Sequence, residues 1–370
     1  MTFLSQLNRF ILSVPRAFIG GPSYAQYMFW SQAPTELNAQ MVWDKFTQPA
    51  HPLYEALLTH YPPGFVRNIL RDTYVARLDR IKGISKHYDV SNDFYKLFLD
   101  KAYMFYTCAD FVSSSDTLED AQENKANYIL NLIDPQPGEK ILDLGCGWGS
   151  MMKKVYSVTK DTKNLVGYTL AEEQRRFIEE EYGFNVVFKD FVTANYEPNS
   201  LDKIYSIGAV EHIPKAKLLT VAQKLAAAIK PTGRIVHHFF CQMGDTLPTR
   251  LMAGADVFPG VELVSLQHHL DIFEQVGLQV NHHSLHDYRP TLRAWFDRLV
   301  ANKDEAIRLV GAQTYNKYLC YLAVAWRLFE NRDLMLTRFL LQRKDVPIMR
   351  MSDVSESKVR PRVFQTSSVT

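Results

Sequence analysis

From about residue 119 onward, short apolar runs alternate with longer stretches whose apolar residues recur every three or four positions. Runs of four to eight apolar residues between turn signals are typical of buried strands, and the longer pattern is typical of helices that pack one face. Strands separated by helices predict a parallel, doubly wound α/β sheet. The expected strands are 140–144, 164–169, 185–189, 202–208 and 233–240, and the expected helices are 119–133, 150–158, 171–182 and 215–229.

The rhythm changes after the fifth expected strand. Residues 241–275 interrupt it with a loop and a helix, which predicts a lid over the ligand edge of the sheet. A long helical region follows at about 290–330, and the apolar run 336–342 is expected to close the sheet.

The two ends of the chain differ from its middle. Residues 1–75 lack the α/β alternation and are punctuated by prolines, so they are expected to form a separate, mainly helical N-terminal region. This region is expected to contact membrane or lipid. Residues 76–345 are assigned to one catalytic domain. Residues 346–370 are polar and rich in serine, which predicts a disordered tail.

Composition narrows the function classes. The 370 residues carry a net charge of only +2, so bulk charge gives no reason to expect a nucleic-acid partner. The four cysteines show no metal-ligand spacing and no paired framework, so we expect no metal site and a reduced, cytoplasmic setting. No apolar run reaches the ~20 residues of a membrane-spanning helix.

The charge is nevertheless uneven along the chain. Residues 67–86 hold six basic residues against two acidic ones, and residues 338–362 hold seven against three. The start, Met1–Gly20, has apolar residues near helical spacing. These features predict a peripheral membrane protein, since each basic residue near an anionic surface contributes ~1 kcal/mol. Ordinary solvated charge and a helix docked on the body are the alternatives.

The segment Ile-Leu-Asp-Leu-Gly-Cys-Gly-Trp-Gly-Ser at 141–150 carries the strongest chemical signal. A strand runs into glycines at 145, 147 and 149, and a helix-like stretch follows. Glycine allows the tight turn and the close approach of backbone to a ligand. The spacing differs from the G-x-G-x-x-G fingerprint and resembles the first motif of class I S-adenosylmethionine (SAM) methyltransferases, with a generic glycine turn as the alternative. Asp143 would then meet a cationic amino group at the strand's end.

Ionisable pairs follow two further strands at the same predicted edge. Glu211 and His212 come directly after the strand 202–208, and His237 and His238 end the next strand. A buried charge is costly, so a purely structural role is the weaker interpretation for the first pair. Paired histidines are more often structural, and only their placement makes one of the second pair a candidate.

The second and third strands supply the remaining cofactor candidates. No acid stands at the tip of the strand that ends in Thr169 and Leu170, so Gln174 or a neighbour has to serve the ribose hydroxyls. Asp190 could accept from the adenine amino group while Phe191 packs on the ring. The alternative for these two residues is a helix cap beside a core aromatic.

Taken in order, these motifs resemble the cyclopropane fatty acid synthase and mycolic acid methyltransferase family. The resemblance covers roughly residues 80–342 and consists of several independent segments, whereas residues 1–75 match much less clearly. The matching stretches are 87–95, 106–109, 142–149, 169–174, 206–212, 258–260 and 288–295.

The resemblance implies transfer of the SAM methyl group to the double bond of an unsaturated phospholipid acyl chain. The alkene attacks the methyl, a carbocation forms, and a bound bicarbonate removes a proton to close a cyclopropane ring. Aromatic faces such as those of Tyr106, Phe239 and Phe240 could stabilise the cation. The family's bicarbonate-binding residues fall on Cys108, Glu211, His238 and Tyr288, with Phe240 in the place of an isoleucine.

The same resemblance implies a set of SAM-binding residues. Residues near the entrance close over the cofactor, the glycine turn holds its methionine and ribose part, and the next two strand ends take the ribose and the adenine. The carried-over residues are Tyr88, Tyr106, Thr107, Asp143, Gly145, Gly147, Thr169, Leu170, Gln174, Asp190 and Phe191.

One departure from the family leaves the product open. A cysteine that many members carry in the penultimate helix falls on Ala325, and Cys320 lies on another face of that helix. A methyl-branched or methylene product would use the same carbocation. The segment 237–241 also resembles benzylisoquinoline N-methyltransferases, and a non-catalytic SAM- or lipid-binding protein is a further alternative. The sequence leaves lipid headgroup, double-bond position and homodimer formation open.

Overall fold

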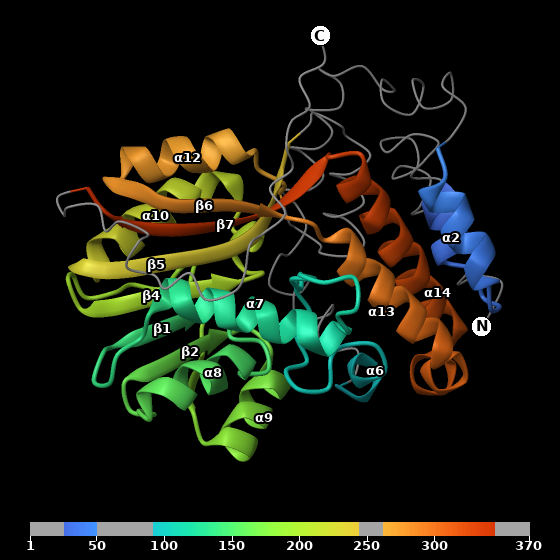
Figure 1. Ribbon diagram of the computed structural model, residues 1–370, viewed down its shortest axis with the longest axis horizontal. Helices are drawn as coiled ribbons and strands as arrows, with labels where there is room; N and C mark the ends of the chain where they lie inside the picture. The colour runs from blue at the N-terminus through green and yellow to red at the C-terminus, as the bar shows by residue number, and fades with distance from the viewer. Residues whose placement is uncertain (1–25, 50–91, 244–261, 345–370) are drawn as a thin grey trace, which may run out of the picture.

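A seven-stranded mixed sheet forms the centre of the molecule (Figure 1), as a computed structural model shows for residues 26–49, 92–243 and 262–344. Its order is β3-β2-β1-β4-β5-β7-β6. Strands β1 to β5 pair in parallel, and β7 runs antiparallel to both β5 and β6. The strands are β1 (Ile141–Leu144), β2 (Leu165–Thr169), β3 (Asn185–Phe188), β4 (Leu201–Ile207), β5 (Ile229–Gln242), β6 (Leu278–His286) and β7 (Leu334–Arg343).

The predicted α/β alternation is confirmed through β5, but the ending of the sheet differs from the prediction. The strand expected to close the sheet lies inside it, between β5 and β6, and the sheet is not purely parallel. Burial explains the order. Strand β7 is buried almost continuously, as an inner strand must be, whereas β6 alternates between buried or half-buried and exposed positions and suits an edge.

Helices cover both faces of the sheet, and strand alternation decides which residues each face receives. Ile141 and Val236 pack toward α7, whereas Leu142 and Ile235 pack toward α10. On the first face lie α7 (Leu118–Ile133), α8 (Ser150–Thr159) and α9 (Glu172–Tyr182), and on the second lie α10 (Lys215–Ala228) and α12 (Leu266–Gln275).

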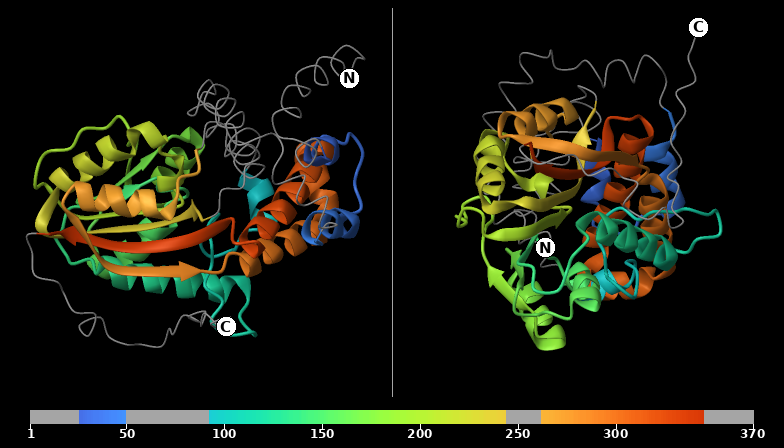
Figure 2. Two further views of the ribbon diagram at one scale, coloured as in Figure 1. Left: turned by 90° about the horizontal axis from the view of Figure 1, so that it is seen from above. Right: turned by 60° about the vertical axis from the view of Figure 1, so that its left-hand side comes forward.

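A separate group of helices stands beyond the carboxyl ends of the parallel strands (Figure 2). Its members share an aromatic-rich core that includes Phe94, Trp295 and Tyr315. Ring pairs at 4.8–6.5 Å between centroids add to the burial of apolar area that holds this group together. The group consists of α2 (Ala39–Thr47), α6 (Asn92–Lys96), α13 (Arg289–Ala301) and α14 (Lys303–Glu330).

The described part of the N-terminal region is tied to these helices. The backbone N–H of Leu37 donates to Asn316 Oδ1 at 3.1 Å, and the Asn316 amide donates back to the carbonyl of Thr35 at 2.7 Å. The ring of Trp43 packs on Phe296 at 4.7 Å between centroids. Residues 26–49 are therefore docked on α13 and α14, and whether residues 1–75 form a separate unit stays a prediction.

The expected lid is wrong for its helical part. Helix α12 buries Ile272 and Phe273 against the sheet beside α10, away from the site described below. Residues 244–261, Met1–Gly20 and the basic segment 67–86 lie outside the described residues. Among the described helices, none is both long and apolar enough to cross a bilayer.

Candidate active site

The turn from β1 into α8 requires its glycines. Gly145 and Gly147 have φ angles of +85° and +53°, in the left-handed region that other residues disfavour. The N–H groups of Gly145 and Cys146 donate to the carbonyl of Tyr168 at 3.0 and 2.9 Å, which holds the turn against β2. A Cβ added at Gly145 would lie 2.8 Å from the Cβ of Ala209. A side chain at Gly145 would therefore clash with Ala209, and one at Gly147 would be strained by the positive φ.

A first pocket opens above this turn and encloses about 930 Å³ of space, open solvent included. It brings together most of the predicted cofactor residues, from the ends of β1 and β2, from the segment after β3 and from the segment before α7. Asp190 is not among its lining residues; its Oδ1 accepts from the N–H of Val192 at 3.0 Å, and Tyr88 lies outside the described residues. The predicted residues that line the pocket are Tyr106, Thr107, Asp143, Gly145, Gly147, Thr169, Leu170, Gln174 and Phe191.

Polar groups in this pocket are buried and oriented. Burial raises the pKa of Asp143 to about 8, with the neighbouring Tyr205 hydroxyl opposing part of the rise. The hydroxyl of Thr169 donates to Gln174 Oε1 at 3.1 Å. The buried carboxyl of Asp143 ionises readily only when a cation enters the pocket, which suits a ligand with a positively charged amino group.

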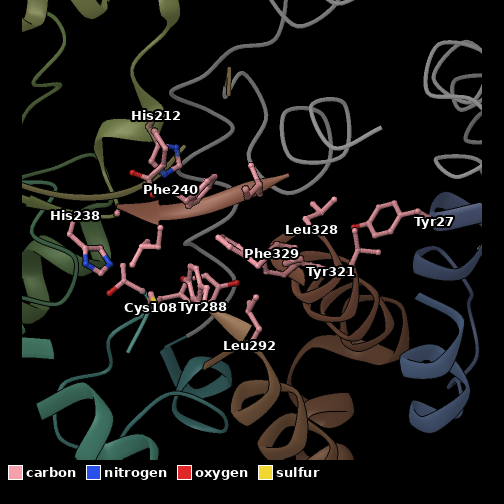
Figure 3. A pocket seen from close by; sticks show the side chains of 18 residues that line it. Tyr27, Cys108, His212, His238, Phe240, Tyr288, Leu292, Tyr321, Leu328 and Phe329 are labelled. Carbon is pink, nitrogen blue, oxygen red and sulfur yellow. The ribbon is translucent and has the colours of Figure 1, made fainter. Parts of the chain in front are cut away.

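A second pocket adjoins the first and encloses about 820 Å³, again with open solvent included. The two share four lining residues: Tyr106, Thr107, Gly208 and His212. Figure 3 shows His238, Cys108 and Tyr288 at one end and Tyr27 at the other. All five residues predicted to act in the reaction line it: Cys108, Glu211, His238, Phe240 and Tyr288.

Strand alternation separates the paired histidines. His237 faces α10 and α12, where its Nδ1 hydrogen-bonds Ser206 Oγ at 2.8 Å and its ring stacks on Phe273. His238 faces the opposite side and lines the second pocket. The sequence marked the pair as a unit, and the pleat makes only His238 a candidate for chemistry.

Glu211 Oε2 and His238 Nε2 are buried in the second pocket without a hydrogen-bond partner among the described residues. Burial raises the pKa of Glu211 to about 8. Burial, with Arg338 nearby, holds the pKa of His238 well below its usual value, and burial keeps the Cys108 thiol protonated by raising its pKa. Near neutral pH the apolar pocket therefore presents neutral polar groups whose hydrogen-bonding capacity is unmet.

A buried ion pair behind His238 was missed from the sequence. Arg338 is fully buried in β7, and its Nη1 and Nη2 donate to the carboxylate of Asp110 at 2.6 and 2.8 Å. Counting Arg338 with a basic surface stretch was wrong, because it has no exposed charge to offer a membrane. The available signal was a single arginine within the apolar run 334–341, since a buried charge requires a partner.

The departure from the family pattern also lies in the second pocket. Ala325 lines it, whereas Cys320 is buried within the aromatic helical core and is not among the lining residues. Cys320 therefore lies on another face of α14 than Ala325, as predicted from the sequence.

The raised pKa of Glu211 has a consequence for stability. The pKa of Glu211 is about 8 in the folded protein and 4.5 in the unfolded chain. As the pH rises from 4.5 to about 8, ionisation of Glu211 therefore lowers the free energy of unfolding by about 1.4 kcal/mol per pH unit. Glu211→Gln should therefore melt at a higher temperature than the parent, with a gap that widens up to about pH 8 and is constant above it.

Thermal unfolding of both proteins across that pH range measures the gap. Glu119→Gln is the control of opposite sign, because the hydrogen bond from Arg298 lowers the pKa of Glu119 and its replacement should destabilise. A gap for Glu211→Gln that does not change with pH would contradict the buried, protonated carboxyl.

Comparison with known proteins places this geometry in a family. The family model for mycolic acid cyclopropane synthetase matches residues 76–339. Cyclopropane mycolic acid synthase 2 of Mycobacterium bovis is 32% identical, over 70% of this chain and 94% of that relative. A probable fatty acid methyltransferase of Mycobacterium tuberculosis is also 32% identical, over 71% of this chain and 63% of that relative.

Solved structures show the same fold. The cyclopropane synthase MmaA2 from Mycobacterium tuberculosis superposes with a TM-score of 0.65 at 25% identity, covering 72% of this chain and 99% of that one. Coclaurine N-methyltransferase, bound to N-methylheliamine and SAH, gives 0.64 at 18% identity over 90% of this chain and 99% of its own, a likeness of fold alone. The chain belongs to the mycolic acid cyclopropane synthetase family and is a SAM-dependent methyltransferase with the class I α/β fold.

Proposed function

We propose that the chain adds a methylene group to the double bond of an unsaturated phospholipid acyl chain, giving a cyclopropane, with bicarbonate as the proton acceptor. The carrying observation is the apolar second pocket, which adjoins the glycine-turn pocket and contains the unpartnered Glu211 Oε2 and His238 Nε2. The names of the relatives, cyclopropane mycolic acid synthases, support a lipid alkene as substrate.

The walls of the second pocket suit an alkyl chain. Apart from the polar end near His238, they are aliphatic and aromatic. The rings of Tyr106 and Phe240 offer π faces to a positive charge that develops on the chain. The apolar wall residues are Leu292, Val324, Leu328, Phe329, Leu334 and Leu336.

The polar end suits a small anion. A carboxylate at Glu211 would repel bicarbonate, but the raised pKa keeps this group protonated near neutral pH, so it can donate a hydrogen bond. The Cys108 thiol lies 3.6 Å from the carbonyl of Asp287, beside Tyr288. Bound SAM supplies an electrophilic methyl group and bound bicarbonate a proton acceptor. The residues Glu211, His238, Cys108 and Tyr288 orient the acceptor and keep it from water.

The first pocket is proposed as the SAM site, with the residues carried over from the family. Asp143 would meet the amino group, the turn at Gly145 and Gly147 the methionine and ribose part, and the pair Thr169 and Gln174 the ribose hydroxyls. Phe191 would pack on the adenine. For Asp190 the proposal is limited to holding the turn that carries Phe191.

A second candidate is methyl transfer to a soluble amine. The coclaurine N-methyltransferase fold covers 90% of this chain, including more of it than the cyclopropane synthase structures do. Phe240 also replaces the family isoleucine. An amine needs only a proton acceptor, such as Glu211 in its ionised form, and no bound anion. With Ala325 in the pocket, methyl-branched and methylene lipids stay further product candidates.

Membrane association is proposed because the proposed substrate, a phospholipid, resides in a bilayer. The supporting segments Met1–Gly20 and 67–86 lie outside the described residues, and of the basic stretch 338–362 only its first part is described. There Arg338 is buried, and Lys344 pairs with Glu274 at 3.4 Å. The proposal therefore depends mainly on the N-terminal segments, and a homodimer is one assembly it would accommodate.

Replacing Gly147 should weaken SAM binding directly. A Cβ there meets no protein atom within 4 Å and would occupy the first pocket. We expect Gly147→Ala to bind SAM at least about tenfold more weakly by calorimetry. The positive φ separately costs the variant ~1–2 kcal/mol of folding stability. Gly138→Ala is the matched control, since Gly138 has φ of +82°, an equally open Cβ position and an exposed site. Equal affinities of the two variants would misplace the SAM site.

Glu211→Gln should separate binding from chemistry. The amide keeps the shape of the carboxyl but cannot exchange a proton, so we expect SAM affinity to stay within about twofold and turnover to fall by ~10²-fold. Turnover of the parent should also drop when bicarbonate is stripped from the buffer and return when it is added. A variant that turns over like the parent would remove Glu211 from the reaction.

Lipid mass spectrometry distinguishes the products. Vesicles of unsaturated phospholipid incubated with the enzyme and SAM should gain one CH₂ unit per reacted double bond and lose the alkene signal. A saturated methyl branch would add two further hydrogens, and a methylene product would keep an alkene. Faster methylation of a soluble benzylisoquinoline amine than of any vesicle would establish the second candidate instead.

A further inference from the structure

His238 is held from behind by a buried arginine. Arg338 Nε donates to His238 Nδ1 at 2.8 Å, and the two residues are direct partners in the β5–β7 register. Both side chains are completely buried. Because β5 and β7 are antiparallel neighbours, the pleat aims both side chains at the face covered by α7.

The guanidinium is fixed by a carboxylate on its other edge. Asp110 accepts from Arg338 Nη1 and Nη2 at 2.6 and 2.8 Å, and its Oδ1 also lies 3.1 Å from His286 Nδ1. Although burial opposes it, Arg338 and His286 hold the pKa of Asp110 below its usual range. The pair thus stays ionised, and Nε has one direction left in which to donate.

This geometry determines the proton position on His238. Arginine has five donors and no acceptor, so His238 Nδ1 must accept with its lone pair. A neutral imidazole that accepts at Nδ1 carries its hydrogen on Nε2. Nε2 is the buried atom that faces the second pocket and has no partner among the described residues.

We propose that Arg338 is a positioning residue that locks His238 in the Nε2–H tautomer, so that the ring donates a hydrogen bond into the substrate pocket. The identity of the acceptor, bicarbonate, rests on the proposed function, whereas the tautomer does not. The opposite tautomer would aim a lone pair at an anion and repel it. The buried ion pair of Arg338 and Asp110 therefore selects one of the two neutral tautomers of His238.

The surroundings of His238 keep it neutral. Burial lowers its pKa first, and the positive charges of Arg338 and Lys125 add to the effect. Lys125, itself buried, donates to Thr107 Oγ1 at 2.8 Å. The titratable and charged groups that face His238 from neighbouring elements are Lys125 of α7, Cys108 and Asp110 of the segment before α7, Glu211 of the short helix after β4, His286 of β6, Tyr288 before α13 and Arg338 of β7.

The tautomer can be observed without any assay of activity. In the full chain labelled with ¹⁵N-histidine, the signals of His238 are identified by their absence from His238→Gln. We expect Nε2 to show the protonated, pyrrole-type shift and Nδ1 the hydrogen-bonded, pyridine-type shift, unchanged between about pH 5 and 8. The reverse assignment would overturn the proposal.

The paired variant Arg338→Met with Asp110→Asn removes the donor without leaving an unpaired buried charge. Its His238 should titrate at a higher pH than in the parent, because the positive charge of Arg338 is gone, while burial still holds the pKa below its usual value. Its KM for bicarbonate should be about tenfold higher than the parent's near pH 8 and approach the parent's as the pH falls, because imidazolium carries a hydrogen on both nitrogens. Arg338→Lys, which keeps a donor, should retain the parent profile.

The matched control is Arg234→Met with Asp134→Asn, a second arginine ion pair attached to β5 but outside both pockets. A loss at all pH values equal to that of the control would mean that Arg338 acts only through stability, and the positioning role would be wrong. If bicarbonate has no effect on either protein while the NMR tautomer is as expected, the proposed function fails and the positioning role stands.

Discussion

The parallel alignment of β1, β4 and β5 is the constraint on which the site depends. It brings three positions together at one edge: the glycine turn after Leu144, the short helix that holds Glu211, and His238, the residue of β5 that pairs with the last residue of β4. None of these segments is long or unusual alone. Their neighbourhood makes two adjoining pockets, one beside the glycine turn and one lined by the helices beyond the sheet.

The second pocket is costly to build, and its cost explains its chemistry. Glu211 Oε2 and His238 Nε2 are withdrawn from water without receiving hydrogen-bond partners from the described chain, so the folded protein is less stable than one with apolar residues there. The same deficit is the capacity to bind a small polar ligand in a dry place. The fully paired Arg338 and Asp110 just behind show that the fold can satisfy buried charge where no ligand is needed.

The fold and several pocket-lining residues could be predicted from the sequence because both follow from local patterns. Strand ends can be found from apolar runs, so side chains at or just after them, such as Asp143 and Glu211, became candidates, whereas Cys108 and Tyr288 were carried over from the family resemblance. Two features could not be found this way. The place of β7 depends on long-range pairing, and the burial of Arg338 depends on Asp110 more than two hundred positions away.

Tyr27 contributes to the second pocket from a segment that precedes the family-matched region 76–339. In the proposed assignment of the pockets, the cofactor site is built by the region that the family model matches, while part of the wall that would meet the substrate comes from the N-terminal segment docked on α13 and α14. Under that assignment, substitutions in the N-terminal segment alone would change the shape of the substrate pocket and leave the sheet as it is.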